Sequence, residues 1–392
     1  MDFDLSWLLL GLPVAFVLGW LASRLDLRQL RLENRQAPKA YFRGLNFLLN
    51  EQQDEAIDAF IEAVQNDPDT QELHFALGNL FRRRGEYQRA VRVHEHLLSR
   101  GDLSRADRER AQHALAQDFL SAGLLDRAEN ALQKLEGTRF ENEARLALLA
   151  IYERSREWTQ AALVAAKLDA AEQASYGTRR AHHFCEQAAE LIARGAVQEE
   201  AMALLRQAAT LAPQAPRPPM DIAALQMHSG QAAAAFETLA SLAETAPLAL
   251  PLFAAQVQQA AVASHRSGEA LALLQRRYAH APSIDVLEAI VALGGSPASE
   301  SGDTPSAPRD GYLAHLIHQP GSLVAASRWL AGERLSDDAR THAPIQRALD
   351  QAARPLMRYR CAACGFEAHQ YFWHCPGCQA WDSYPPRRVE EL

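Results

Sequence analysis

The stretch from His74 to Leu98, HFALGNLFRRRGEYQRAVRVHEHLL, decides the fold of this chain. Its alanine at position 90 belongs to a series that recurs at nearly constant spacing. Ala56 and Ala90 are 34 residues apart, and Ala201, Ala235 and Ala270 follow one another at steps of 34 and 35. Between these two groups, Ala128 and Ala161 are 33 residues apart. A fixed period of this length indicates an array of similar structural units stacked along the chain.

The period matches the tetratricopeptide repeat, whose unit is two antiparallel helices. The recurring alanine marks the place where the second helix crosses the first so closely that only a small side chain fits. Gly44 and Gly78 do the same from the first helix, and large residues three positions later, Phe47 and Phe81, fill the space beside them. Phe119 and Tyr152 take that place in later units.

Glycine and proline mark the ends of these helices. A glycine ends the first helix of several units because it accepts a left-handed backbone: Gly85, Gly123, Gly195 and Gly230. A proline twelve residues after the recurring alanine ends the second helix: Pro68, Pro213, Pro247 and Pro282. The recurring proline disfavours the alternative of an unrelated alanine-rich bundle. We therefore predict a mainly α-helical solenoid of about seven units over residues 39–293.

Such an array presents a concave groove suited to a peptide or a partner helix. We find no catalytic constellation in it. Asn79 and the run Arg82–Arg84 suit an acidic partner, but an arginine run more often forms a solvated helix face, which is the favoured interpretation here. Cys185 is expected to be a small buried residue, and His182 and His183 to be ordinary helix residues.

Composition narrows the class of protein. The chain has 392 residues, a formal net charge of −8 and a pI near 6.0, so a broadly basic nucleic-acid-binding surface is not expected. Nearly half of the residues are hydrophobic, at 48%, which is typical of a folded protein. Five cysteines are too few for a disulfide scaffold of this size, and their clustering near the C-terminus favours metal binding in a reducing compartment.

Residues 5–22, LSWLLLGLPVAFVLGWLA, carry no charge. A helix of that length spans roughly 27 Å, enough for the core of a bilayer. Acidic residues precede it and arginines follow it, so the positive-inside rule places the N-terminus outside and the rest of the chain in the cytoplasm. We predict a retained transmembrane anchor at 1–23 and a basic juxtamembrane segment at 24–38. A cleaved signal peptide needs a positive n-region and a cleavage site, and neither is clear.

Residues 294–311, GGSPASESGDTPSAPRDG, are rich in Gly, Ser and Pro and are predicted to form a linker. Residues 312–355 are again helical in pattern, with breaks expected at Pro320 and Pro344. This helical end region would pack against the array as an irregular cap.

The last segment, predicted as a metal-binding domain over 356–386, reads YRCAACGFEAHQYFWHCPGCQAWDSYPP from Tyr359 to Pro386. Two Cys-x-x-Cys turns each aim a pair of thiolates at one point, and ten residues between them allow a short hairpin that joins the turns. The predicted ligands of one Zn²⁺ or iron ion are Cys361, Cys364, Cys375 and Cys378. His369 and His374 are not needed, since four thiolates complete the shell.

Two features around these cysteines bear on how the segment folds. Gly365 permits the left-handed backbone that lets N–H groups face the sulfurs. The aromatic residues offer a small packing set: Phe366, Tyr371, Phe372, Trp373, Trp381 and Tyr384. Burial alone cannot hold so small a module, so the metal is expected to supply much of its folding free energy.

The spacing of the cysteines leaves the role of the metal open. Iron in such a site carries electrons, whereas zinc acts as a structural clip. The chain has no Gly-rich dinucleotide fingerprint, which favours the structural role, with a membrane-tethered rubredoxin-like electron carrier as the alternative.

The predicted anchor, the repeats and the terminal cysteine pairs together resemble the lipopolysaccharide assembly protein B family. The matching segments are YFRGLNFLLNEQQDEAIDAFIEAV from Tyr41, ALGNLFRRRGEYQRAVRVH from Ala76, and CAACGF with YFWHCPGCQAW from Cys361 and Tyr371. The resemblance covers nearly the whole chain and is weakest over 294–356. The second cysteine turn differs from rubredoxins proper, which usually have glycine at the position of Gln379. This difference disfavours the interpretation as an electron carrier.

The resemblance implies a regulator rather than an enzyme. Members of this family are adaptors on the cytoplasmic side of the inner membrane of Gram-negative bacteria. They promote degradation of LpxC, the deacetylase that commits precursors to lipid A, by the membrane-anchored protease FtsH. A membrane sensor of lipopolysaccharide restrains them, and lipopolysaccharide transport proteins are further expected partners. A general tetratricopeptide scaffold or co-chaperone is a third possibility, and a homo-oligomer is left open.

Overall fold

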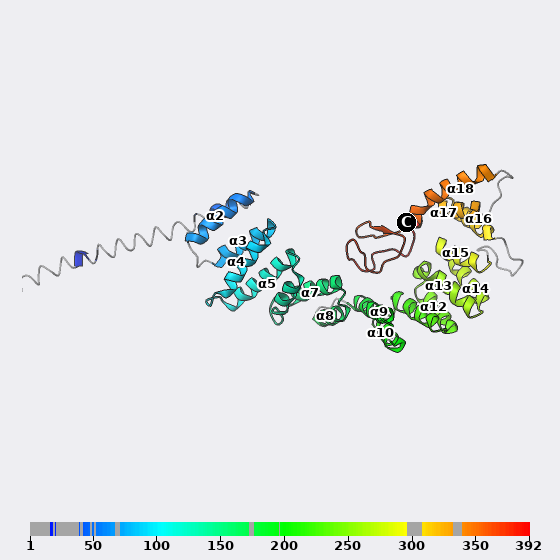
Figure 1. The fold of residues 1–392 in the computed structure, drawn as a ribbon, viewed down its shortest axis with the longest axis horizontal. Coiled ribbons are helices and arrows are strands. Elements are labelled where there is room, and N and C mark those ends of the chain that lie inside the picture. The colour runs from blue at the N-terminus through cyan, green and yellow to red at the C-terminus, as the bar shows by residue number, and fades with distance from the viewer. Residues whose placement is uncertain are drawn as a thin grey trace, which may run out of the picture. The chain divides into compact units, whose positions relative to one another are not determined.

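The computed structural model describes residues 16–18, 20, 39, 42–47, 49–50, 52–66, 71–171, 176–195, 197–295, 308–331 and 339–392. Most of the predicted anchor at 1–23, the whole basic segment at 24–38, Pro68 and most of the predicted linker lie outside these residues. The chain divides into two compact units, residues 1–155 and 156–392. Each unit is described separately below (Figure 1).

All regular secondary structure in the described residues of unit 1 is helical. Residues 42–47 are helical, and the labelled helices follow: α2 (Gln53–Asn66), α3 (Gln71–Arg83), α4 (Tyr87–Ser99), α5 (Arg105–Ser121), α6 (Leu125–Gln133) and α7 (Glu141–Ser155). Helices α3 with α4 and α5 with α6 form two consecutive pairs, and each helix packs on its neighbours along the chain. This is the arrangement of a helical repeat array.

Unit 2 continues with helices and ends in a small irregular module. Its helices are α8 (Trp158–Ala171), α9 (Gly177–Ala193), α10 (Gln198–Leu211), α11 (Arg217–His228), α12 (Ala232–Thr245), α13 (Leu250–Ala263), α14 (Ser267–His280), α15 (Ile284–Ala292), α16 (Pro308–His318), α17 (Leu323–Ala331) and α18 (Ala339–Ala353). Short 3₁₀ turns are η1 (Pro247–Ala249), η2 (Arg354–Met357) and η3 (Val389–Glu391). Strands β1 (Tyr359–Arg360) and β2 (Glu367–Ala368) pair antiparallel, with Tyr359 opposite Ala368.

The recurring alanines lie where the repeat argument requires. All seven are at most 1% exposed: Ala56, Ala90, Ala128, Ala161, Ala201, Ala235 and Ala270. The first-helix glycines meet the second helix closely, since a Cβ on Gly44 would lie 3.0 Å from the Phe60 ring and one on Gly78 would lie 2.5 Å from the His94 ring. These contacts confirm the predicted close helix crossing.

The turns within the repeats use a left-handed residue, as predicted, but glycine is not always that residue. Gly85 and Gly230 have φ of 83° and 73°. At the corresponding turns before α8 and α14, Arg156 and His265 take φ of 60° and 58° instead. A side chain makes this conformation costly by roughly 1 kcal/mol, so glycine is the residue expected at such a turn. The glycine positions therefore did not reveal these two turns.

The end region differs from the prediction at one proline. Pro320 separates α16 from α17 as expected. Pro344, expected to break the chain, lies inside α18 (Ala339–Ala353). Pro344 is the sixth residue of this helix, so the position lacks one backbone hydrogen bond, and the helix continues through it.

Within the residues described, no single helix is long and apolar enough to cross a membrane. In the same part of the chain, α12 together with η1 and α13 meets that length and composition jointly, and this pair is bent by 115°.

Candidate metal centre

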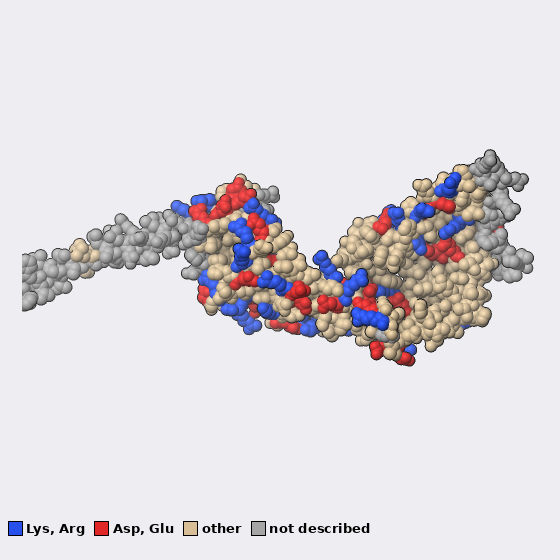
Figure 2. All heavy atoms as spheres, in the orientation of Figure 1, with Lys and Arg blue, Asp and Glu red and all other residues tan. Residues whose placement is uncertain are grey.

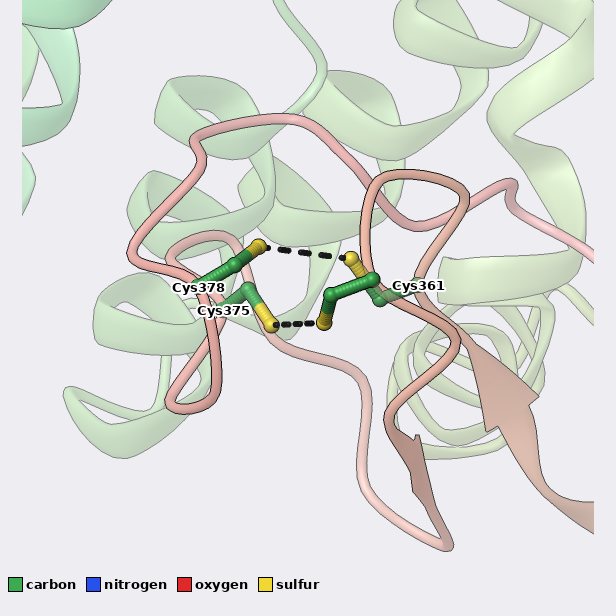
Figure 3. A group of neighbouring side chains, drawn as sticks. Cys361, Cys375 and Cys378 are labelled. Atoms are coloured by element: carbon green, nitrogen blue, oxygen red, sulfur yellow. Dashed lines mark hydrogen bonds between the residues drawn. The ribbon is translucent and has the colours of Figure 1, made fainter. Parts of the chain in front are cut away.

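The four predicted ligands lie together at the end of unit 2. The sulfur atoms of Cys361, Cys364, Cys375 and Cys378 are all within 4.8 Å of one another. Cys361 Sγ is 3.8 Å from Cys378 Sγ, and Cys364 Sγ is 3.7 Å from Cys375 Sγ (Figure 3). Four sulfurs at the usual zinc–sulfur distance of about 2.3 Å from one ion would be about 3.8 Å apart. The donor set therefore fits a single tetrahedral metal ion.

Each Cys-x-x-Cys turn is built by the same backbone hydrogen bonds. In the first turn the N–H of Cys361 donates to the carbonyl of Phe366 at 2.9 Å, and the N–H of Gly365 donates to the carbonyl of Cys361 at 2.9 Å. In the second, the N–H of Cys375 donates to Ala380 at 2.9 Å and that of Gln379 to Cys375 at 2.8 Å. The two turns are thus equivalent by backbone geometry.

The residue after each second cysteine adopts a left-handed conformation. Gly365 has φ of 78°, and Gln379 has φ of 60° at the equivalent place in the second turn. Glycine accepts this conformation without steric cost, whereas glutamine does not. The left-handed residue turns the following amide toward the sulfur, so the second turn keeps the geometry at the expense of some backbone strain.

Amide hydrogens point at the sulfurs and favour the thiolate form. For Cys361, desolvation opposes ionisation, but hydrogen bonds from the Ser383 hydroxyl and from the N–H groups of Cys364 and Ala363 outweigh it and lower its pKa to about 6. For Cys364, the N–H of Phe366 favours the thiolate, yet desolvation and the other sulfurs raise its pKa to about 12. Thiols that share protons in this way all become thiolates when a cation replaces the protons.

The second turn follows the same principle. Desolvation raises the pKa of Cys375, but N–H groups of Cys378 and Gly377 and the Tyr384 hydroxyl outweigh it, so the net shift is downward. Cys375 is fully buried and Cys378 is exposed, so one face of the sulfur cluster is covered and the other is open to ions from solvent.

The aromatic residues divide between two roles that the sequence did not separate. Tyr384 is 2% exposed and packs with Tyr371 and Phe372 inside the module. Trp373 and Trp381 instead face α9 and α11. Phe366 is 42% exposed and lies beside Gly377 of the second turn, where a Cβ would meet it at 3.4 Å.

The module docks on α9 through a stack of rings. Trp381 lies between His182 and His374, with ring centroids 4.8 Å and 4.4 Å apart and interplanar angles of 16° and 19°. His182 Nε2 is 2.9 Å from both carboxylate oxygens of Asp382. The interpretation of His182 as an ordinary helix residue was therefore wrong, because this side chain is 2% exposed and holds the module.

A buried arginine lies beside the second ring nitrogen of His182. Arg217, at the start of α11, donates to Glu186 at 2.6 Å and lies 3.4 Å from His182 Nδ1. Its guanidinium is 5.9 Å from the Trp373 ring. Burial opposes its charge, but Asp221 and Glu186 outweigh this effect and raise its pKa. The chain thus places a permanent cation beneath the docked module.

The C-terminal tail ties the same module to the end helices. Arg388 donates to both carboxylate oxygens of Asp285, at 2.9 and 2.8 Å. Glu391 accepts from the N–H of Ile284 at 2.5 Å, at the start of α15, and Glu390 accepts from the N–H of Val324 at 2.8 Å in α17. Carboxylates at helix N-termini satisfy free N–H groups and interact favourably with the helix dipole.

The remaining cysteine is separate from the cluster. Cys185 in α9 is 1% exposed, which confirms the prediction that it is a small buried residue. Burial raises the pKa of its thiol well above the usual range. A buried thiol of this kind is neither nucleophilic nor suited to metal binding.

Comparison with known proteins identifies the family of this chain. Residues 359–385 match the family model described as the rubredoxin metal binding domain. The chain is 32% identical over 396 residues to lipopolysaccharide assembly protein B of Escherichia coli strain K12, with 98% of each chain covered. This chain belongs to the lipopolysaccharide assembly protein B family.

A second relative and a solved structure are also similar to this chain. Lipopolysaccharide assembly protein B of Haemophilus influenzae is 26% identical over 409 residues, again with 98% of each chain covered. Among solved structures, a tetratricopeptide repeat protein of Parabacteroides merdae is 16% identical, with a TM-score of 0.33 and 66% of this chain covered against 99% of that one. The assignment to the lipopolysaccharide assembly protein B family rests on the sequence relatives.

Proposed function

We propose that this chain is a regulator of lipopolysaccharide biosynthesis that acts as an adaptor at the inner membrane. The supporting observation is its 32% identity to lipopolysaccharide assembly protein B of Escherichia coli over 98% of both chains. In this proposal the chain promotes degradation of the deacetylase LpxC by the protease FtsH, as the family resemblance implies. The chain itself performs no chemical step.

The repeat array suits an adaptor because it offers surface rather than a reaction centre. Stacked helix pairs in a repeat array form a concave surface, and such surfaces bind peptides or partner helices. In the part of the chain that the structure describes, the group of side chains arranged to hold a metal is the four-cysteine cluster. Four thiolates fill a tetrahedral shell and leave no position for a substrate.

We propose that the four cysteines hold one Zn²⁺ or iron ion as a structural clip. The bound ion would neutralise the thiolates and link the two Cys-x-x-Cys turns. His182, Asp382 and Arg217 would then keep the folded module against α9 and α11. In this role the ion fixes a surface of unit 2.

We also propose that residues 1–23 anchor the chain in the inner membrane, with the remainder in the cytoplasm. Confinement to the membrane would raise the effective concentration of the adaptor near a membrane-bound protease. The absence of charge over residues 5–22 and the arginines that follow support this topology.

Depletion of the protein in its own cells tests the proposal. We expect LpxC to accumulate, and re-expression of the full chain should restore its normal level. A Cys361→Ser or Cys364→Ser chain should lose metal and fail to restore it, while Cys185→Ala, which removes the cysteine outside the cluster, should restore it fully. An unchanged LpxC level on depletion would contradict the adaptor role.

The metal itself distinguishes the adaptor from the electron carrier. Protein purified with zinc alone should restore LpxC turnover as well as protein loaded with iron, because a clip needs no redox change. Turnover that requires iron and a reversible one-electron couple would favour the carrier instead.

A further inference from the structure

A polar cavity of about 550 Å³ lies in unit 1, away from the cysteine cluster. It is bounded by helices α3 and α5 and by the beginning of α7, which are first helices of successive repeats. Its polar lining includes Asn79, Arg82, Arg110, His113 and Arg139. A cavity on this side of a repeat array faces the groove in which such proteins bind their partners.

The charge of the cavity is opposite to that of the chain. The chain has a net charge of −8, yet three arginines line the cavity and Glu143 is the single carboxylate among its lining residues. Acidic and basic side chains are otherwise intermingled over α3–α7 on the face that Figure 2 shows. Burial lowers the pKa of His113, and its Nε2 lies 3.2 Å from a carboxylate oxygen of Glu143, so this imidazole pairs with the one acidic lining residue.

Two of the guanidinium groups lie over aromatic rings. Arg110 is 4.1 Å from the centroid of Phe75, and Arg139 is 4.7 Å from that of Phe140. The His113 ring also stacks on Phe140, with the ring centroids 4.4 Å apart and an interplanar angle of 8°. Rings that hold guanidinium groups reduce the entropy lost when these groups bind a ligand.

The third arginine is fixed by hydrogen bonds. Arg82 Nη1 donates to Asp118 at 2.8 Å and to the Ala114 carbonyl at 3.1 Å, while Nη2 donates to Asn79 Oδ1 at 2.7 Å. Asp118 is fully buried and also lies 2.5 Å from His94 Nδ1. This network orients Asn79 so that its amide oxygen is occupied and its NH₂ group is left to donate. The expectation that Arg82 belongs to a solvated helix face was therefore wrong.

The other two arginines are available to a ligand. Arg110 pairs with Glu72 at 2.7 Å, but both side chains are substantially exposed, at 39% and 60%, and such surface pairs contribute little. Arg139 is exposed, and no carboxylate among the residues described forms an ion pair with it. Guanidinium groups bind carboxylates through two parallel hydrogen bonds, so both positions suit an acidic ligand.

We propose that this cavity, defined by Asn79, Arg82, Arg110, His113 and Arg139, binds an acidic segment of a partner protein through its carboxylates. Charge complementarity selects this occupant, because three arginines and a single glutamate line the cavity. A second cavity of unit 1, beside Gly85, has one glutamate and one arginine in its lining and so offers no such excess of positive charge. The biological identity of the partner rests on the proposed adaptor function, but the affinity of the cavity for acidic peptides does not.

Peptide binding by the purified full chain tests the proposal. The probes are a fluorescent glutamate-rich peptide and glutamine-rich and lysine-rich peptides of the same length, titrated at low and high salt. We expect the glutamate-rich peptide alone to bind, with an affinity that falls as salt screens the charges. Arg110→Gln and Arg139→Gln should each weaken binding about tenfold, the effect of losing one charge-assisted hydrogen-bonded contact.

The matched control is Arg108→Gln, which removes the same charge from an exposed position of α5 that does not line the cavity. It should leave binding unchanged, and Arg139→Lys should retain part of the affinity because it keeps the charge without the planar fork. Circular dichroism should show all variants folded, since the substituted side chains are exposed or half-buried.

Three results would overturn the proposal. The first is equal binding of the glutamine-rich peptide, and the second is equal loss of affinity in the Arg108→Gln control. The third is tighter binding of a single-stranded oligonucleotide or of anionic lipid vesicles, abolished by the same two substitutions, which would assign the cavity to phosphate groups. None of these results bears on LpxC levels after depletion, so failure here is distinguishable from failure of the adaptor role.

Discussion

The repeat array and the cysteine module are held together by different means. In the array, each helix pair buries a small set of side chains against its neighbours, and the seven recurring alanines show the same close crossing repeated along the chain. In the module, two short turns and a two-residue strand pair surround four sulfurs, and few side chains are buried. Stability is therefore distributed in the array and concentrated in the module.

This difference predicts how each region responds to damage. A substitution in the array should weaken one or two neighbouring pairs, because contacts are made mainly between adjacent elements. A substitution at the sulfur cluster should affect the module as a whole. The ring stack between Trp381 and His182 is one of the places where the two regions meet within unit 2, so it offers a test intermediate between these extremes.

The largest effect is expected for Cys375→Ser. This fully buried sulfur contributes one of four ligands, and loss of a structural site removes binding free energy on the order of 10 kcal/mol. We expect metal content, measured by elemental analysis, to fall to background and tryptophan fluorescence to report exposure of Trp373 and Trp381. The helical signal in circular dichroism should persist. Cys185→Ala is the control, and loss of metal from it would contradict the assignment.

A smaller effect is expected for Trp381→Ala, which separates docking from metal binding. Removing a half-buried ring stacked on His182 should destabilise the docked module by about 3 kcal/mol, at the low end for losing a tryptophan. Limited proteolysis should then cut near β1 faster, while metal content stays unchanged. Trp381→Phe should restore most of the protection because it keeps a stacking ring. Loss of metal together with docking would show that the two cannot be separated.

In the array, Ala235→Leu should act locally. Ala235 is fully buried between α12 and its neighbours, so a larger side chain should destabilise unit 2 by about 2 kcal/mol through overpacking. Denaturant unfolding followed by circular dichroism would measure this effect. Ala233→Leu, on the exposed side of the same helix, should change little. An equal effect of both substitutions would mean that position 235 does not mark the helix crossing.

The array could be predicted because its determinants are local. The alanine, the turn glycine and the proline act within a single repeat. Because they recur at a fixed period, they can be recognised even where the repeats differ in the rest of their sequence. The turns at Arg156 and His265 escaped notice because a non-glycine residue adopts the left-handed conformation there. The prediction at Pro344 was wrong because local chemistry alone predicted a break, whereas α18 continues through the proline.

The sulfur cluster could also be predicted, because two Cys-x-x-Cys turns contain their own geometry. Its docking could not. His182 and Asp382 are 200 residues apart, and nothing in the spacing of either side chain indicates the other. The same holds for Glu390 and Glu391, whose carboxylates accept hydrogen bonds from the N-termini of distant helices. Contacts made once between distant segments leave no period for a sequence to reveal.

The smallest predicted effect compares the two Cys-x-x-Cys turns directly. Gln379 occupies with φ of 60° the place that Gly365 occupies with φ of 78°, and the flanking hydrogen bonds are the same. Gln379→Gly should relieve the left-handed strain and stabilise the metal-bound module by about 1 kcal/mol, less the extra backbone entropy that glycine loses on folding. Competition with a chelator, which reports retention of the metal, would measure this gain.

The reverse substitution Gly365→Gln should reduce retention by a similar amount, since the two turns share one backbone geometry. If the first change weakened metal retention, the Gln379 side chain would contribute a contact that outweighs the strain, and the two turns would not be equivalent.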